Sequence, residues 1–151
     1  MRPVLFLDID GVLNGHVFHP QAQSNTIDPA CVAHLNKVIA DTDCALVISS
    51  AWRYMVLLGS MTLKGFEHLL RTHGVNAKGR VIGTTGRGEE NGNHNDRVRL
   101  IRNWLKENPT KQWAVVDDMN VGMERLVQTS GSIGLTGADA ERLISMLRRG
   151  P

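Results

Sequence analysis

The chain has 151 residues, of which 42% are hydrophobic and 21% are charged, and its formal net charge is +2. This length fits one compact domain over residues 1–151, which is large enough to bury a core without disulfides. No apolar run approaches the roughly 20 residues that span a bilayer. The apolar start is also too short for a signal peptide and is followed by acids, so we expect a cytoplasmic protein without a membrane segment. The small positive charge permits a polyanionic partner but does not by itself indicate a nucleic-acid-binding protein.

The first third of the chain predicts two buried strands with a helix between them. Residues 3–9 form an apolar run that ends in acids, which is typical of a parallel strand buried on both faces. Asp28 and Pro29 supply an N-cap and a first-turn proline, so a helix is expected over residues 29–40. Residues 44–48 form the second apolar run and predict the second buried strand.

The middle of the chain predicts two more helices, a short strand and a loop. Residues 66–73 have a helical pattern that Gly74 ends. A short strand is expected at residues 81–82. Residues 84–95 are rich in glycine, asparagine and charge, which indicates a loop. Residues 96–108 then carry apolar side chains at helical spacing and predict a long helix.

The last third predicts a strand and two helices. Residues 113–116 are apolar and predict a buried strand, and residues 121–126 suggest a short helix. Thr136 and Asp139 form a capping pair for a last helix, which Gly150 would close. Strands that alternate with helices predict an α/β fold with a parallel sheet covered on both faces. Ligands of such sheets bind beyond the carboxyl ends of the strands.

The first predicted strand ends in two acids at alternating positions, Asp8 and Asp10, followed by Gly11. Side chains alternate along an extended chain, so both carboxylates can point the same way. Two adjacent carboxylates repel each other unless a cation lies between them or one is protonated. The alternative is a strand end with two solvated acids before a turn.

The second predicted strand ends in Ser49 and Ser50, and Arg53 follows. A hydroxyl at this place can donate to a phosphate oxygen, and an arginine can form a bidentate pair with an anion. The alternatives are a strand that turns on serine, which is common, and a surface arginine.

The strand predicted over residues 113–116 is followed by a second acidic pair, Asp117 and Asp118. Mg²⁺ prefers oxygen ligands and keeps several waters, so a few carboxylates and a phosphate suffice to hold it. The alternative is again a solvated pair at a turn.

In combination and in this order, four motifs resemble the haloacid dehalogenase (HAD) superfamily of phosphohydrolases. They are Asp8-Ile9-Asp10-Gly11-Val12, Ile48-Ser49-Ser50, a basic residue near Arg97, and Val116-Asp117-Asp118. The resemblance implies a three-layer Rossmann-like (HAD-like) fold. Three further segments look like the small capless branch, which includes the HAD domains of RNA-repair proteins: Ser49-Ser50-Ala51-Trp52-Arg53, Ile101-Arg102-Asn103-Trp104-Leu105 and Gly134-Leu135-Thr136.

The resemblance implies a role for each matched residue. Asp8 would attack phosphorus, and Asp10 would protonate the leaving oxygen and later deprotonate a water. Ser49 would hold the phosphoryl oxygens. Mg²⁺ would be held by Asp8, the main-chain carbonyl of Asp10, and Asp117, with Asp118 in the same shell or one water away.

A basic residue should complete the phosphate clamp, together with Ser50 and Arg53. We choose Arg97, near the start of the helix predicted over residues 96–108, because the Ile101-Trp104-Leu105 face of this helix fits the family pattern. Helix N-termini also favour anions. Arg99, Arg87 and Lys78 are the rival candidates.

The substrate is a phosphorylated molecule whose identity the sequence leaves open. Only residues 14–27 separate the first acids from the first helix, which leaves room for a flap but not for a cap domain, and there is no space after Ser49 for an inserted sheet domain. An open site of this kind suits a large substrate such as a nucleic-acid end, and a nucleotide is the other candidate. The same residues would serve phosphoryl transfer to another acceptor. The alternative from another class is a non-catalytic module that binds Mg²⁺ or a phosphorylated partner, and the presence of Asp10 counts against it.

Overall fold

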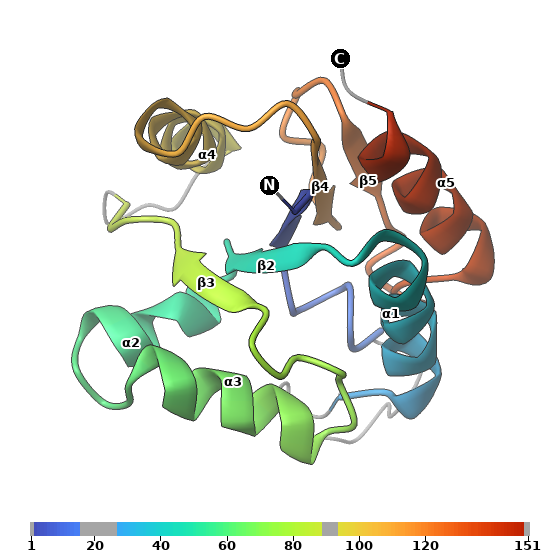
Figure 1. Cartoon of the computed structure of the whole chain (residues 1–151), viewed down its shortest axis with the longest axis horizontal. Helices are drawn as coiled ribbons and strands as arrows, with labels where there is room; N and C mark the ends of the chain where they lie inside the picture. The colour runs from blue at the N-terminus through green and yellow to red at the C-terminus, as the bar shows by residue number, and fades with distance from the viewer. Residues whose placement is uncertain (1, 16–26, 89–93, 150–151) are drawn as a thin grey trace.

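The computed structural model describes residues 2–15, 27–88 and 94–149 (Figure 1). Its centre is a parallel sheet with the strand order β3-β2-β1-β4-β5. The strand that starts the chain therefore lies in the middle of the sheet, with one neighbour from each half of the sequence. The strands are β1 (Val4–Leu7), β2 (Ala45–Ile48), β3 (Val81–Thr84), β4 (Trp113–Asp117) and β5 (Leu126–Gln128).

Helices cover both faces of the sheet, which confirms the three-layer α/β fold. Helices α1 and α5 lie side by side, and α4 lies apart from them (Figure 1). Side chains of α1, α3 and α5 share one core cluster, whereas α4 packs into the other. The helical elements are α1 (Pro29–Thr42), the 3₁₀ turn η1 (Ala51–Arg53), α2 (Tyr54–Leu57), α3 (Leu63–Thr72), α4 (His94–Glu107) and α5 (Gly137–Arg148).

The central strand β1 is apolar throughout because helices cover it on both sides. Leu5 and Leu7 belong to the core cluster of α1, α3 and α5, and Phe6 belongs to the cluster of α4. The Phe6 ring meets two indoles edge-on, with centroids 5.4 Å from Trp104 and 6.3 Å from Trp113. Both faces of the strand are therefore closed to water, and only its two ends are open to ligands.

The elements predicted from apolar runs are present, with different bounds. The first strand is shorter than residues 3–9, and the helix expected over residues 66–73 begins at Leu63. Its cap is Thr62, whose Oγ1 accepts a hydrogen bond from the Gly65 N–H at 3.0 Å. The capping box of Thr136 and Asp139 at the start of α5 is confirmed. Gly150, predicted to close this helix, lies outside the described residues.

The short helix predicted over residues 121–126 is wrong, because this segment leads into strand β5. Gly122 and Arg125 have φ values of +69° and +62°, which a right-handed helix does not admit. The Arg125 guanidinium donates to the carbonyls of Trp113, Met146 and Arg149. It thereby ties the segment to the start of β4 and the end of α5, so that the next residues add a strand to the sheet.

Two other expectations concern insertions and membranes. Between β2 and β3 the chain forms η1, α2 and α3, with no inserted sheet among these described residues. Residues 16–26, within the segment where a flap was expected, lie outside the described residues. No helix in the described ranges is both long and apolar enough to cross a membrane.

The buried ring of Phe6 makes a direct stability prediction. Phe6→Ala leaves a cavity between two indoles, and we expect it to lower the free energy of unfolding by about 3–5 kcal/mol. The control is Leu58→Ala, because Leu58 is 64% exposed and its truncation should change stability by less than about 0.5 kcal/mol. Urea denaturation measures both, and equal losses would contradict the packing described for β1.

Candidate active site

The parallel register brings the predicted residues to one edge of the sheet. β1 pairs in register with both β2 and β4. Just beyond this ladder, Asp8 donates its N–H to the Val116 carbonyl at 3.1 Å, and Ser49 donates its N–H to the Leu7 carbonyl at 3.0 Å. Asp8, Ser49 and Asp117 therefore lie level at the carboxyl ends of three neighbouring strands, where parallel sheets bind ligands.

Three carboxylates are gathered at this edge. Asp8, Asp117 and Asp118 each offer an oxygen, and these oxygens all lie within 4.8 Å of one another. Asp8 is 2% exposed and Asp117 is 0% exposed, while Asp118 is half-buried. Burial, followed by the charge of Asp117, raises the pKa of Asp8 to about 8. Burial likewise raises the pKa of Asp117, so this cluster favours a bound cation.

Arg97 reaches into the carboxylate cluster from the first turns of α4. Its Nη1 lies 2.7 Å from Asp117 Oδ2 and 3.2 Å from Asp8 Oδ1. Burial acts to lower the pKa of Arg97, but the two carboxylates outweigh it and raise that pKa. One guanidinium balances one of three carboxylates, so two negative charges are left when all are ionised. Carboxylate oxygens in this number suit Mg²⁺.

The rival basic residues lie or pair away from the carboxylate cluster in the described structure. Arg99 pairs with Asp96 on its own helix. Arg87 donates to the Leu57 carbonyl at 3.3 Å. Lys78 lies in the connection between α3 and β3, which enters the sheet at its opposite edge. None of the three forms an ion pair with the carboxylate cluster within the described ranges.

Ser49 presents a buried hydroxyl at the same edge. Its side chain is 3% exposed, and within the described residues its Oγ has no hydrogen-bond partner. Leaving a buried hydroxyl unpaired costs about 1–3 kcal/mol, which a bound ligand oxygen would recover. Ser50 differs, because its Oγ accepts the Trp52 N–H at 3.2 Å and caps η1. The predicted contact of Ser50 with phosphate stays a prediction.

Arg53 is 6% exposed and donates to the chain itself. Its Nε donates to the Gly86 carbonyl at 3.0 Å, and its Nη1 donates to the Ser50 carbonyl at 3.0 Å. Its guanidinium carbon lies 4.6 Å from the centre of the Tyr54 ring, and burial lowers its pKa. Arg53 thus joins the turn after β2 to the segment after β3, and its predicted pairing with phosphate stays a prediction.

Asp10 is exposed and lies outside the carboxylate cluster. Its Oδ1 accepts from Asn14 Nδ2 and its Oδ2 accepts from Trp52 Nε1, both at 3.1 Å. Sequence reasoning assigned Asp10 but neither of these donors. No sequence motif marks Asn14 as a site residue, whereas Trp52 lies within one of the segments that resemble the capless HAD branch.

Gly11 lets the loop after β1 pass closely beside the cluster. Its φ is +80°, and a Cβ at this position would lie 2.3 Å from Asp118 Oδ2. Its carbonyl accepts the buried Thr129 hydroxyl at 2.7 Å. Thr129 was missed because its partner is 118 residues away in the sequence.

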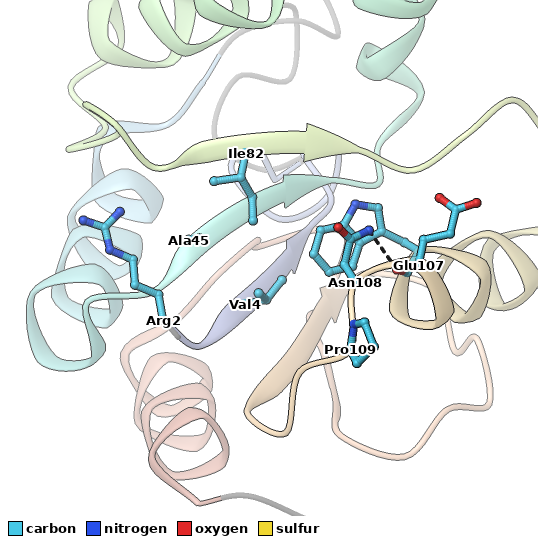
Figure 2. A pocket seen from close by; sticks show the side chains of 8 residues that line it. Arg2, Val4, Ala45, Ile82, Glu107, Asn108 and Pro109 are labelled. Atoms are coloured by element: carbon cyan, nitrogen blue, oxygen red, sulfur yellow. Dashed lines mark hydrogen bonds between the residues drawn. The ribbon is translucent and has the colours of Figure 1, made fainter.

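The structure also contains an apolar hollow of about 540 Å³. Figure 2 shows Val4, Ala45 and Ile82 in its wall, and the first two of these begin their strands. The hollow thus opens at the amino-terminal edge of the sheet, opposite the carboxylate cluster. We place the candidate active site at the cluster, because the charged groups converge there.

Comparison with known proteins identifies a family for most of the chain. The family model described as "HAD domain in Swiss Army Knife RNA repair proteins" matches residues 4–140, which include every residue placed in the site above. Searches of curated proteins and of solved structures found no match.

The close approach of Gly11 to Asp118 can be tested with a matched pair of glycines. Gly11→Ala and Gly59→Ala each place a Cβ at a positive φ, which is +80° at Gly11 and +82° at Gly59. For this reason each substitution should lower the free energy of unfolding by about 1–2 kcal/mol. No atom lies within 4 Å of the Cβ at Gly59. In denaturation experiments, Gly11→Ala should lower the free energy of unfolding by a further ~1–3 kcal/mol, because Asp118 must move. Equal losses would contradict the contact.

The charge balance of the cluster predicts how Arg97 affects stability. Without divalent cations, Arg97→Met should destabilise the protein by about 3 kcal/mol, because it leaves buried carboxylates unpaired. Mg²⁺ should then raise the melting temperature of this variant more than that of the unaltered protein. The control is Arg102→Met. Arg102 lies on α4 like Arg97, but it pairs at the protein surface with Glu124, which precedes β5. Identical responses of the two variants to Mg²⁺ would speak against a cation site beside Arg97.

Proposed function

The chain belongs to the family of HAD domains in Swiss Army Knife RNA repair proteins, and from this premise we propose that it is a Mg²⁺-dependent phosphomonoester hydrolase that forms an aspartyl-phosphate on Asp8. The observation that carries the proposal is the cluster of Asp8, Asp117 and Asp118, whose oxygens lie within 4.8 Å of one another at the carboxyl edge of the sheet. Such a cluster can hold a cation, which a carboxylate nucleophile needs because it must approach an anionic phosphate.

The proposed reaction has two displacements at phosphorus. In the first, an Asp8 carboxylate oxygen bonds to phosphorus, the bond to the leaving oxygen breaks, and Asp10 gives that oxygen a proton. In the second, Asp10 takes a proton from water as the water oxygen bonds to phosphorus. The bond between phosphorus and the Asp8 oxygen then breaks, which releases phosphate and restores both carboxyl groups.

Positive charge is required at Asp8 for the first displacement. With its pKa at about 8 in the absence of a cation, Asp8 is largely protonated at neutral pH and is then a poor nucleophile. Arg97, 3.2 Å away, favours the ionised form. The residues that would hold Mg²⁺ are Asp8, Asp117 and Asp118 through their side chains and Asp10 through its carbonyl. When bound, Mg²⁺ supplies charge that neutralises both the carboxylates and the phosphate.

The phosphoryl oxygens have two candidate donors. The Ser49 hydroxyl is buried at the end of β2 without a protein partner in the described residues. The Arg97 guanidinium carries several N–H groups, of which Nη1 faces Asp8 and Asp117. We propose that these groups bind the phosphate while Arg53 holds the surrounding loops.

The proposed substrate is a nucleotide or the terminal phosphate of a nucleic acid. Support comes from the family description, which names RNA repair proteins. Between β2 and β3, both within the described residues, the chain carries no inserted sheet that could serve as a cap. The formal charge of +2 is compatible with a polyanionic substrate.

The activity is tested by phosphate release from a panel of monoesters that includes phosphorylated oligonucleotides, nucleotides and sugar phosphates. We expect release with Mg²⁺ and none with a chelator. Asp8→Asn should reduce release by about 10³-fold or more while the protein stays folded. Asp41→Asn is the matched control, because Asp41 pairs with Lys37 at the surface of α1, and it should retain full activity.

The outcomes of this panel separate the parts of the proposal. Near-normal release by Asp8→Asn would refute the nucleophile. A strong preference for sugar phosphates over oligonucleotides and nucleotides would refute the proposed substrate but keep the chemistry. Binding of phosphorylated ligands without any release would favour the non-catalytic alternative.

A further inference from the structure

The Asp10 carboxylate is held by two N–H groups from different parts of the chain. Asn14 Nδ2 donates to Oδ1, and Trp52 Nε1 donates to Oδ2, each at 3.1 Å. An exposed aspartate ordinarily samples several rotamers in water. With one donor on each oxygen, both the position and the plane of this carboxylate are fixed.

Each donor is itself fixed by contacts that leave little freedom. The Trp52 backbone N–H is capped by Ser50 Oγ at 3.2 Å, and its indole packs against the core cluster of α1, α3 and α5 together with Val56 and Met61. The Asn14 amide oxygen accepts the Gly11 N–H at 2.9 Å, which directs the amide nitrogen toward Asp10. The two donors are therefore placed by contacts other than those with the Asp10 side chain.

The indole contact is specific in its chemistry. The Trp side chain has a single polar hydrogen and no acceptor, so it can serve a carboxylate only as a donor. A carboxyl oxygen that accepts this N–H keeps a second lone pair, and the other oxygen can carry a proton at the same time. The contact is thus compatible with both the protonated and the ionised forms that a general acid and base must take.

From this geometry we infer that Trp52 is a positioning residue for the general acid and base Asp10, with Asn14 as its partner. The inference rests on the proposed function and deepens it. Asp10 gives its proton to the leaving oxygen as the bond from phosphorus to that oxygen breaks, and it later takes a proton from the attacking water. Trp52 holds the carboxyl group where both transfers are possible, so less orientational freedom is lost in each transition state.

This role differs from a purely structural one in its dependence on the leaving group. A poor leaving group, such as an alkyl alcohol, needs a proton as it departs, whereas 4-nitrophenolate departs without one. Loss of the Trp52 N–H should therefore slow the hydrolysis of alkyl phosphates selectively. A merely structural defect would slow both kinds of ester alike.

The first test is Trp52→Phe, which removes the N–H and keeps an aromatic ring. We expect kcat/KM to fall about tenfold or more for an alkyl phosphate and by less than about twofold for 4-nitrophenyl phosphate. Trp104→Phe is the control, because Trp104 packs on Phe6 in the core cluster of α4, and it should leave the ratio between the two esters unchanged. Equal loss on both esters in Trp52→Phe would overturn the inference.

A double-mutant cycle connects the effect to Asp10. Asp10→Asn alone should lower the alkyl phosphate rate more than Trp52→Phe does. Adding Trp52→Phe to Asp10→Asn should lower the rate of alkyl phosphate hydrolysis little further, because the group that Trp52 positions is already lost. Losses that multiply would show that Trp52 acts through something other than Asp10 and would overturn the inference.

A measurement that needs no turnover tests the contact itself. In a ¹⁵N-correlated NMR spectrum, Asp10→Ala should shift the indole N–H resonance of Trp52 and leave those of Trp104 and Trp113 in place. An unmoved Trp52 resonance would overturn the inference whatever the activity. If the resonance shifts but the unaltered protein releases no phosphate from any ester, the contact exists and the proposed function fails, and the catalytic role of Trp52 fails with it.

Discussion

The structure depends on one electrostatic constraint, the crowding of three carboxylates against a single guanidinium at the edge of a buried sheet. Asp8 and Asp117 are almost fully buried, and Arg97 lies within 3.2 Å of both. Burial disfavours charge, so the metal-free cluster tends to take up a proton, and the raised pKa of Asp8 reflects this. A bound cation would reverse that preference, and Asp8, the proposed nucleophile, would then be ionised.

The surrounding structure holds this cluster together mainly through contacts to backbone atoms. Gly11 allows the first loop to pass within contact distance of Asp118, and the hydroxyl of Thr129, the residue after β5, fixes the Gly11 carbonyl. Arg53 secures the loops after β2 and β3 through their carbonyls. Ser49 alone offers a buried hydroxyl without a partner among the described residues. These contacts therefore shape a site in which the carboxylates and Arg97 converge on the residues proposed to react.

Local patterns in the sequence predicted the parts of the site that depend on strand ends. Apolar runs that stop at acids or serine place Asp8, Ser49 and Asp117 at one sheet edge whatever the details of packing, and Arg97 follows from a helix start near that edge. The contact between Trp52 and Asp10 could not be predicted, because it joins residues 42 positions apart through side-chain geometry. The strand β5 was missed for a similar reason, since its pairing partner lies in β4 and its own three residues carry no pattern.

The central claim, that Asp8 becomes phosphorylated, is tested most directly by locating the phosphoryl group. The Asp10→Asn variant, which should hydrolyse the intermediate slowly, would be mixed with 4-nitrophenyl phosphate and Mg²⁺, quenched in acid, digested and analysed by mass spectrometry. The account predicts one phosphoryl group on Asp8, removable by hydroxylamine as an acyl phosphate is. A phosphoryl group on another residue such as Ser49, or none on the protein while 4-nitrophenol is still released, would contradict it.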